Sequence, residues 1–260
     1  MLRFRDDRTG SLAELTLAPS VPLRVYVDGA SCGAEFGLRE ARILLVADVL
    51  ARIAELSGLQ VVTVLTAAPG RAPEGLEPSV TALGLHPPAV AGSAAEAEAL
   101  LGGRAHVRIA ASAAGRDDGG DGVVIGVGPA DDLTPGGRAA QPGASGGTAG
   151  DLLALRLALL WRPYRQPVRL TEAALAEAEG TARRWRQAVA KWAAEPSRPI
   201  PAETARRLSL AFDNDLNTVA ALDILLGVES DPEAPAGGKF ETFAFADRVL
   251  GLELVREIGR

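Results

Sequence analysis

The sequence has few of the residues that bind metals, form disulfides or attract polyanions. Its 260 residues include one cysteine and two histidines, and 27 lysines and arginines stand against 33 aspartates and glutamates, for a formal net charge of -6. A single cysteine excludes an internal disulfide. The acidic balance argues against a sequence-independent nucleic-acid binder, which needs clustered positive charge to release counterions from the phosphate backbone.

Long hydrophobic runs are also missing. No apolar segment reaches the roughly 18 to 20 residues that span a bilayer, and even ARILLVADVLARIAEL carries charges along one side. The N-terminal MLRFRDDRTG has neither the apolar stretch nor the cleavage site of a signal peptide. We therefore predict a soluble cytoplasmic protein without a membrane partner. The 47% hydrophobic content is enough for one large core or two modest ones.

The first half of the chain alternates strands and helices. Leu23 to Gly29 reads as a strand, Leu38 to Ser57 as a helix with apolar residues every three or four positions, and Leu59 to Ala67 as a buried strand. This order predicts a βαβ unit, whose ligand crevice lies at the carboxyl ends of the strands. Asp28 to Gly37 would therefore line the crevice.

The remaining elements divide the chain into an α/β part and a helical part. We expect a helix at Ser93 to Leu101, strands at His106 to Ser112 and Gly122 to Gly128, and a mobile loop or linker over the Gly/Pro/Ala-rich Pro129 to Gly150. Helices then dominate. They are expected from Asp151 to Trp161, from Thr171 (as N-cap) to Ala194, and at Ala202 to Phe212, Asp215 to Leu226 and Phe240 to Leu250.

The order of elements thus predicts an α/β, Rossmann-like parallel-sheet domain followed by an all-α helical bundle. The expected boundary separates residues 1–148 from residues 149–260. Trp161, Tyr164, Trp185 and Trp192 fall in the second part, where packing in the core or an interface is the default role of aromatic residues.

Several segments resemble those of the cysteinyl-tRNA synthetases. ALRLALLWRPYRQPVRLT, Ala154 to Thr171, is similar to their ALRLFLLSTHYRSPLNFS-type segment, and NDLNTVAAL, Asn214 to Leu222, to their DDFNTPEAL segment. VYVDGASCGAEFGLREAR, Val25 to Arg42, matches YVCGPTVYDYAHIGHAR in length, while VRIAASA and VVIGVGPADDLTPGGRAA resemble WHIECSA and FDIHGGGIDLIFPHHENE. The chain stops soon after VLGLEL, so it looks more like the short-ended mycothiol-pathway cysteine ligase than a synthetase with an anticodon-binding tail. The family resemblance implies that the first domain is a HUP-type nucleotide-binding domain.

The resemblance implies ATP-dependent activation of cysteine at a zinc ion, but the matching positions lack the zinc ligands. Asp28, Ala111, Gly136 and Ala140 stand in place of Cys, Cys, His and Glu. One carboxylate and three groups without donor atoms do not make the tetrahedral N/S site that zinc prefers. A zinc cofactor is therefore not expected.

The two nucleotide-binding signatures are altered as well. The HIGH signature falls on Gly37, Leu38, Arg39 and Glu40, so both imidazoles are replaced and Glu40 adds a negative charge near the phosphates. The KMSKS loop would fall within Gly137 to Gly150, a segment without lysine whose only cation is Arg138. These losses predict a truncated, catalytically degenerate paralogue of the cysteinyl-tRNA synthetase and cysteine ligase group, with no catalytic residues assigned.

The expected vestigial crevice combines eight candidate ligand-binding residues. A structural alternative stands beside six of them: a tight strand-to-helix loop for Asp28, Gly29 and Ser31, a small buried thiol for Cys32, a favourable helix-dipole position for Glu40, and a solvated loop for Asp131. The candidates are Asp28, Gly29, Ser31, Cys32, Gly37, Glu40, Arg42 and Asp131.

Two main functions remain open from the sequence. The first is a non-catalytic, regulatory pseudoenzyme without a cofactor that binds a small molecule or another protein. The alternative is a diverged ATP-dependent aminoacyl (cysteine) ligase in which Arg39, Arg42 or Arg138 replaces the lost cations. ATP is expected only under this alternative. Binding of tRNA by the helical part is disfavoured, since acidic residues offset the basic cluster Arg183, Arg184 and Arg186.

Overall fold

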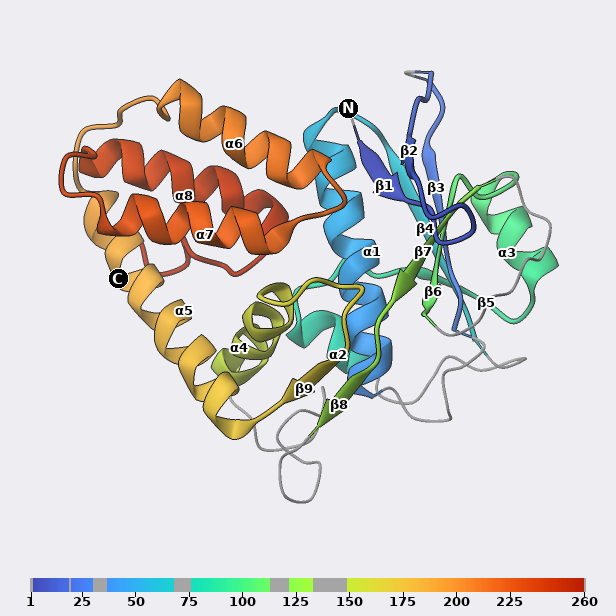
Figure 1. Ribbon diagram of the computed structural model, residues 1–260. Coiled ribbons are helices and arrows are strands. Elements are labelled where there is room, and N and C mark those ends of the chain that lie inside the picture. Colours follow the sequence, from blue (N-terminus) through green and yellow to red (C-terminus); the bar gives the residue numbers. More distant parts are fainter. Residues whose placement is uncertain are drawn as a thin grey trace.

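A computed structural model gives the fold. Within it, a five-stranded parallel sheet and a group of helices lie on opposite sides of one long helix (Figure 1). The structure describes residues 2–18, 20–29, 37–67, 76–112, 122–132 and 149–259.

The central sheet has a Rossmann-like strand order. Its strands are β3 (Leu23–Val27), β4 (Val61–Thr66), β5 (Ala89–Ala91), β6 (Val107–Ala111) and β7 (Val123–Val127), in the order β5-β4-β3-β6-β7. All pairs are parallel. The chain winds outward in both directions from the β3/β6 pair, and ligands of open α/β sheets bind where the strand order reverses in this way. The predicted α/β fold is confirmed.

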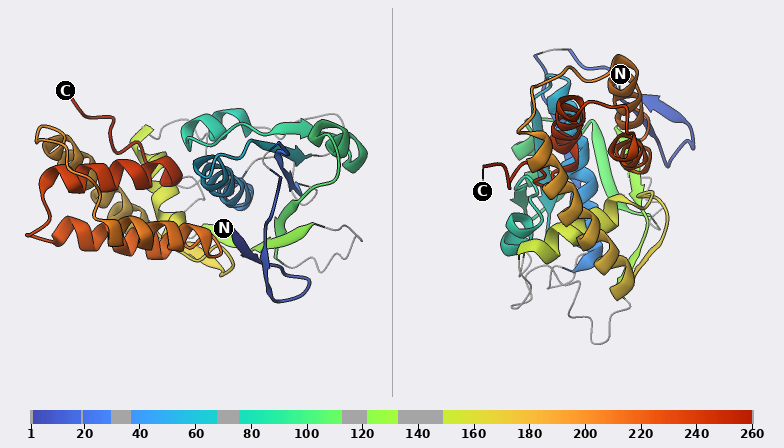
Figure 2. Two further views of the ribbon diagram at one scale, coloured as in Figure 1. Left: turned by 90° about the horizontal axis from the view of Figure 1, so that it is seen from above. Right: turned by 90° about the vertical axis from the view of Figure 1, so that its left-hand side faces the viewer.

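The helix α1 (Leu38–Leu56) is buried on nearly all sides. It packs on the sheet with one face and against α8 (Ala236–Leu250) of the helical half with another, so it separates the two parts of the molecule (Figures 1 and 2). The charged residues that the sequence suggests for an exposed side include Arg42 and Asp48, yet these are only 1% and 3% exposed. Across the described part of the chain, no helix is long and apolar enough to cross a membrane.

The opposite face of the sheet and its edge carry smaller elements. The helix α3 (Ala94–Leu101) packs on β3 and β4 on the face away from α1 (Figure 2). The hairpin β1 (Arg3–Arg5) and β2 (Leu12–Glu14) lies beside β7. The hairpin, the short helix α2 (Leu76–Ala82) and β5 were not predicted, because each is too short to show a clear hydrophobic period.

The helical half begins with the buried helix α4 and ends with α8. Its helices are α4 (Ala149–Leu160), α5 (Glu172–Trp192), α6 (Ala202–Asp213), α7 (Thr218–Ser230) and α8. Thr171 is the N-cap of α5, as predicted, and its hydroxyl accepts a hydrogen bond from the Ala174 N–H at 3.2 Å. Trp185 is fully buried and contacts Phe243 edge to face, with ring centroids 5.4 Å apart.

Two boundaries in this half differ from the predictions. The expected helix at Asp215 to Leu226 begins only at Thr218, because Asp215 and Leu216 have positive φ angles of 58° and 52°. The predicted loop from Pro129 to Gly150 contains β8 (Ala130–Asp132), which pairs in parallel with β9 (Val168–Leu170). That pairing needs only three residues, so composition could not reveal it.

The two halves share one hydrophobic core. A continuous cluster of buried side chains includes Val25 and Ile109 of the sheet, Leu50 of α1, and Trp185 and Phe243 of the helices. Among the described residues this cluster extends across the expected boundary near residue 148, and the boundary itself stays a prediction. α1 contributes to the core with both its sheet-facing and its helix-facing side chains.

Candidate functional site

The strand ends at which the sequence predicts the crevice are those of β3 and β6, which lie side by side. Val27 and Ile109 are register partners, and the Asp28 N–H donates to the Ile109 carbonyl at 2.8 Å. Asp28 and Ala111 therefore leave adjacent strands at the point where the strand order reverses. This is the edge at which the sequence places the crevice.

Gly29 occupies a position that no larger residue could take without a shift. Its N–H donates to the Thr66 hydroxyl at 3.2 Å, and a Cβ added to Gly29 would lie 2.0 Å from the Thr66 carbonyl oxygen. The close approach of the chain after β3 to the end of β4 is enough to explain why this residue is a glycine. This contact fits the alternative of a tight strand-to-helix loop.

Glu40 closes the first turn of α1 on itself. Gly37 is the N-cap of α1, and its N–H donates to Glu40 Oε2 at 3.0 Å. The Glu40 side chain is largely buried, so the carboxylate stays close to the helix N-terminus. A carboxylate there is favoured by the helix dipole and occupies a position that a bound anion could otherwise take.

Arg42 is held by main-chain carbonyls. Its Nη1 donates to Gly128 at 2.8 Å and Pro129 at 2.9 Å, and its Nη2 donates to Pro163 at 3.0 Å. Burial lowers the pKa of Arg42 to about 10. The guanidinium thus links α1 to the segments before β8 and β9. Its Nη1 and Nη2 groups already donate hydrogen bonds to these carbonyls.

The other candidates divide into described and undescribed residues. Asp131 lies on β8, opposite Arg169 of β9, with an exposed side chain, and β8 packs against α1. Ser31, Cys32 and Arg138 lie outside the described residues, as do residues 137–148 of the segment expected to hold the KMSKS loop. The described candidates lie at the carboxyl edge of the sheet. The hydrogen bonds of Glu40 and Arg42 all go to main-chain groups of the protein, so these bonds do not indicate a ligand.

The described part of the expected zinc site does not fit zinc. Asp28 and Ala111 lie at neighbouring strand ends, as the resemblance implies, but the methyl group of Ala111 offers no donor atom. Among the described residues, no group of three or more His, Cys, Asp or Glu side chains is arranged to hold a metal ion. We therefore derive no chemistry through zinc.

A buried charge network joins α1 to the helical half. Asp48 of α1 accepts from Arg156 of α4 at 2.6 Å and from Arg52 at 2.8 Å. Arg156 is fully buried and also donates to the carbonyls of Leu250 and Leu83. Burial raises the pKa of Asp48, but attraction to Arg156 and the His86 hydrogen bond outweigh it and hold this pKa well below its usual value.

Gly251 makes room for this network. It caps the C-terminus of α8 at a φ of +60°, and a Cβ at this position would lie 2.7 Å from Arg156 Nη2. A positive φ favours glycine. Sequence analysis missed the network, although charged residues within otherwise apolar helices, such as Arg156 in DLLALRLALLW, were the available signal.

A second cluster ties the N-terminal hairpin to the helical half. The Tyr164 hydroxyl donates to Asp215 Oδ1 at 2.6 Å, and the Arg5 N–H donates to the same oxygen at 2.9 Å. Arg165 pairs with Asp215 and with Asp7. Burial and the Asp215 hydrogen bond raise the pKa of Tyr164 well above its usual value. The cluster explains the unusual backbone at Asp215 as a structural anchor.

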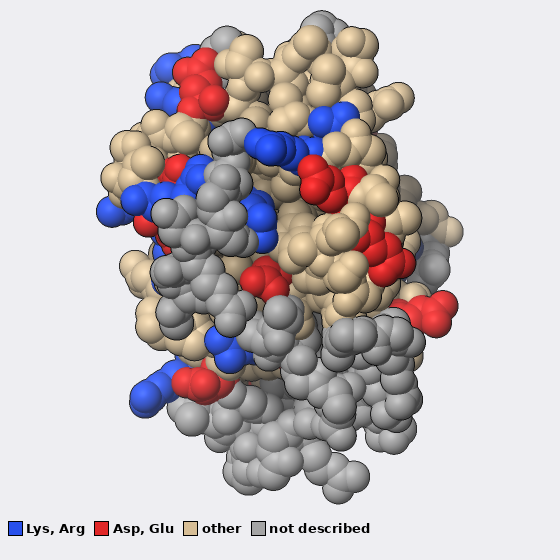
Figure 3. Space-filling model, turned by 90° about the vertical axis from the view of Figure 1, so that its right-hand side faces the viewer, with Lys and Arg blue, Asp and Glu red and all other residues tan. Residues whose placement is uncertain are grey.

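The face that carries α3 shows mixed charge. Basic and acidic side chains both appear there (Figure 3). Arg24 donates to the Leu101 carbonyl at 3.0 Å, and Arg108 lies over the Tyr26 ring at 4.4 Å. Both arginines have partners within the protein, so they do not indicate a binding site for a polyanion on this face.

Comparison with known proteins supports the resemblance over part of the chain. The chain is 42% identical over 112 residues to the L-cysteine:1D-myo-inositol 2-amino-2-deoxy-alpha-D-glucopyranoside ligase of Thermobifida fusca (strain YX). The matched region covers 41% of this chain and 26% of that ligase. No protein-family model matches.

This similarity supports a relationship to cysteine ligases of the cysteinyl-tRNA synthetase type, in agreement with the Rossmann-like sheet. The chain spans about a quarter of the length of the ligase it matches. Truncation and loss of catalysis are separate predictions, and the match does not test them.

Proposed function

We propose that this protein is a cysteine-ligase-like binding protein that does not form an adenylate. Its strand-end crevice, at the ends of β3 and β6, would bind a small molecule or a segment of another protein in a regulatory role. The partial similarity to a cysteine ligase and the parallel sheet with its crevice edge support the scaffold.

The observation that carries this proposal is the first turn of α1. The resemblance assigns this turn to ATP phosphates, but here the Glu40 carboxylate accepts from the Gly37 N–H at 3.0 Å. A phosphate approaching the same turn would meet a negative charge instead of two imidazoles. Arg42, the nearest buried cation on α1, already donates to three carbonyls.

The test is cysteine-dependent exchange of pyrophosphate into ATP by the full chain, with and without added zinc. A second assay adds the amino sugar-inositol acceptor named for the Thermobifida fusca ligase and measures product. We expect neither activity above a protein-free blank. Either activity above the blank would contradict the proposal.

The alternative is a diverged ATP-dependent cysteine ligase, and one observation favours it. Arg39 lies in the first turn of α1 with an exposed side chain and has no hydrogen bond or ion pair to any other described residue. It could meet a phosphate from outside the turn that Glu40 closes. Under this alternative, Arg39 supplies the charge that the lost imidazoles provided.

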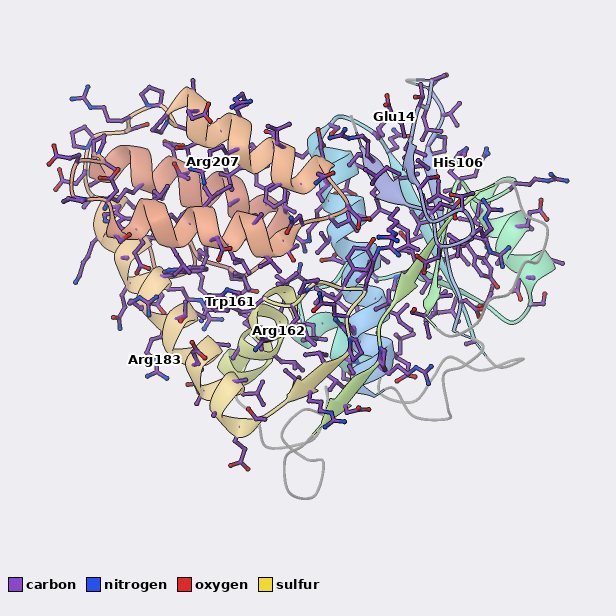
Figure 4. The ribbon with its side chains drawn as sticks, in the orientation of Figure 1. Glu14, His106, Trp161, Arg162, Arg183 and Arg207 are labelled. Atoms are coloured by element: carbon purple, nitrogen blue, oxygen red, sulfur yellow. The ribbon has the colours of Figure 1, made fainter. Side chains whose placement is uncertain are left out.

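Nucleotide binding separates the two candidates. Under the alternative, calorimetry detects ATP binding, and Arg39→Gln weakens it by roughly tenfold, as expected for loss of one charge-assisted hydrogen bond. Arg207→Gln is the matched control, since Arg207 is an exposed arginine on α6 (Figure 4). Absence of binding at millimolar ATP would rule out the ligase.

A further inference from the structure

A groove between α4, β9 and α5 is lined by residues other than the strand-end candidates, although Arg169 of its lining is the register partner of Asp131. Its volume is about 230 Å³, which is below the roughly 300 Å³ at which pockets for drug-sized ligands begin. It therefore suits a small molecule. The lining residues are Ala158, Trp161, Arg162, Val168, Arg169, Leu170, Ala174, Glu177 and Ala178.

The groove combines two cations with one anion. Arg162 and Arg169 line it with exposed side chains, and Glu177 of α5 lines it as well. None of these three side chains forms a hydrogen bond or ion pair with another residue in the described ranges of the chain. Their charged groups are available to a ligand that carries charges of both signs.

The apolar part of the groove is firmly supported. Trp161 packs against the fully buried Trp185, with ring centroids 6.1 Å apart. Val168, Leu170 and Ala178 also line the groove and are nearly fully buried, so packing holds them in place. Figure 4 shows Trp161 and Arg162 beside α4, with α5 on one side of them and α1 on the other.

We propose that this groove binds a small zwitterion of the α-amino acid type with an apolar side chain. Arg162 and Arg169 would donate to its carboxylate, and Glu177 would accept from its ammonium group. The side chain would lie against Trp161. A phosphate or dicarboxylate fits less well, because Glu177 would repel a second negative charge. The inference does not depend on the proposed function, since it concerns a different set of residues.

The first experiment compares three ligands of similar shape by titration calorimetry with the full chain. L-leucine carries both charges, isocaproate lacks the ammonium group, and isoamylamine lacks the carboxylate. We expect leucine to bind roughly tenfold more tightly than either analogue, since each loses charge-assisted hydrogen bonds. Equal affinities, or no leucine binding up to its solubility limit, would overturn the inference.

The second experiment assigns binding to the groove. Arg169→Gln should reduce leucine affinity toward that of isoamylamine, and Glu177→Gln should reduce it toward that of isocaproate. Arg207→Gln, an exposed change on α6 away from the groove, should leave it unchanged. Leucine binding that persists in both groove variants would overturn this inference without touching the proposed function.

Discussion

Arg42 and Asp48 illustrate how a charged residue acts within the core. Both lie on α1, and both are nearly inaccessible to water. A buried charge is costly unless partners satisfy it, and removal of one partner leaves the other unpaired. Arg42 is satisfied by three carbonyls, whereas Asp48 is satisfied by arginine and histidine side chains. These contacts give both residues a structural explanation.

Replacing Arg42 should lower the stability of the fold even when no ligand is present. Arg42→Met keeps an apolar stem but leaves the carbonyls of Gly128, Pro129 and Pro163 without this donor. We expect a loss of about 2 to 4 kcal/mol in the free energy of unfolding, measured by urea denaturation. Arg39→Met is the matched control on the exposed side of the same turn and should change little. Equal effects of the two variants would contradict the structural role.

The two histidines should shift stability with pH in opposite directions. The Asp48 hydrogen bond raises the pKa of His86, so its stabilisation is complete below about pH 6.5 and is lost as pH rises through the raised pKa. Burial and Arg24 lower the pKa of His106, whose Nδ1 accepts from the Arg24 N–H. Its neutral form is favoured, so His106 destabilises the fold as pH falls below about 6.5.

Urea denaturation between about pH 5.5 and pH 8 tests both signs, because this range brackets the ordinary histidine pKa. At about pH 5.5, His86→Gln should have a lower free energy of unfolding than the unmodified protein, because the stabilising contact of His86 is gone. His106→Gln should lose less stability on acidification than the unmodified protein, because no residue at position 106 then has to be protonated. The two variants serve as controls for each other. Parallel shifts in both would show that local contacts do not set these pKa values.

At the scale of elements, the start of one helix could be predicted from the sequence and the start of another could not. Thr171 could be predicted as an N-cap because its hydroxyl bonds within the same turn. The start of α7 could not, because the backbone at Asp215 is fixed by Tyr164, Arg165 and Arg5, which are distant in sequence. Sequence patterns predict helix ends that are set by bonds within one turn, but not helix ends that are set by tertiary contacts.

Removing the N-cap of α5 should cost about 1 kcal/mol. Thr171→Ala leaves the Ala174 N–H without its acceptor at the first turn. The matched control is Ser209→Ala, an exposed hydroxyl inside α6, which should change stability by less than about 0.5 kcal/mol. Thermal unfolding followed by circular dichroism measures both. A Thr171 variant as stable as the control would contradict the cap.

At the scale of the whole molecule, we expect the sheet and the helices to unfold as one unit. They share a core, and the Asp48 to Arg156 ion pair links residues 108 positions apart. All three tryptophans, Trp161, Trp185 and Trp192, lie in the helical half. Tryptophan fluorescence therefore reports on the helices, and amide exchange at β3 and β4 reports on the sheet.

Asp48→Asn should weaken both halves together. Removing the charge leaves Arg156 buried without its ion-pair partner, so we expect a loss of about 3 to 5 kcal/mol in unfolding free energy. Fluorescence and amide exchange should report the same loss. Asp223→Asn, an exposed change on α7, is the control. A loss confined to one half would contradict a shared core.

The sequence was sufficient for four of the five strands of the parallel sheet, for α1 and for the buried helices, because their hydrophobic patterns are local properties. It also pointed to Glu40 and Gly29 as residues with structural explanations, which their bonds now support. It could not reveal that Arg42 bonds to a carbonyl 121 residues away. It also missed the groove, whose residues come together only when α4, β9 and α5 pack.

The central claim is that the strand-end crevice binds without activating cysteine. Cysteine-dependent ATP–pyrophosphate exchange tests it most directly, because it detects the adenylate step whatever the acceptor. With the full chain, millimolar ATP and added zinc, we predict exchange no faster than in a protein-free blank. Exchange above the blank that requires both the protein and cysteine would contradict the account.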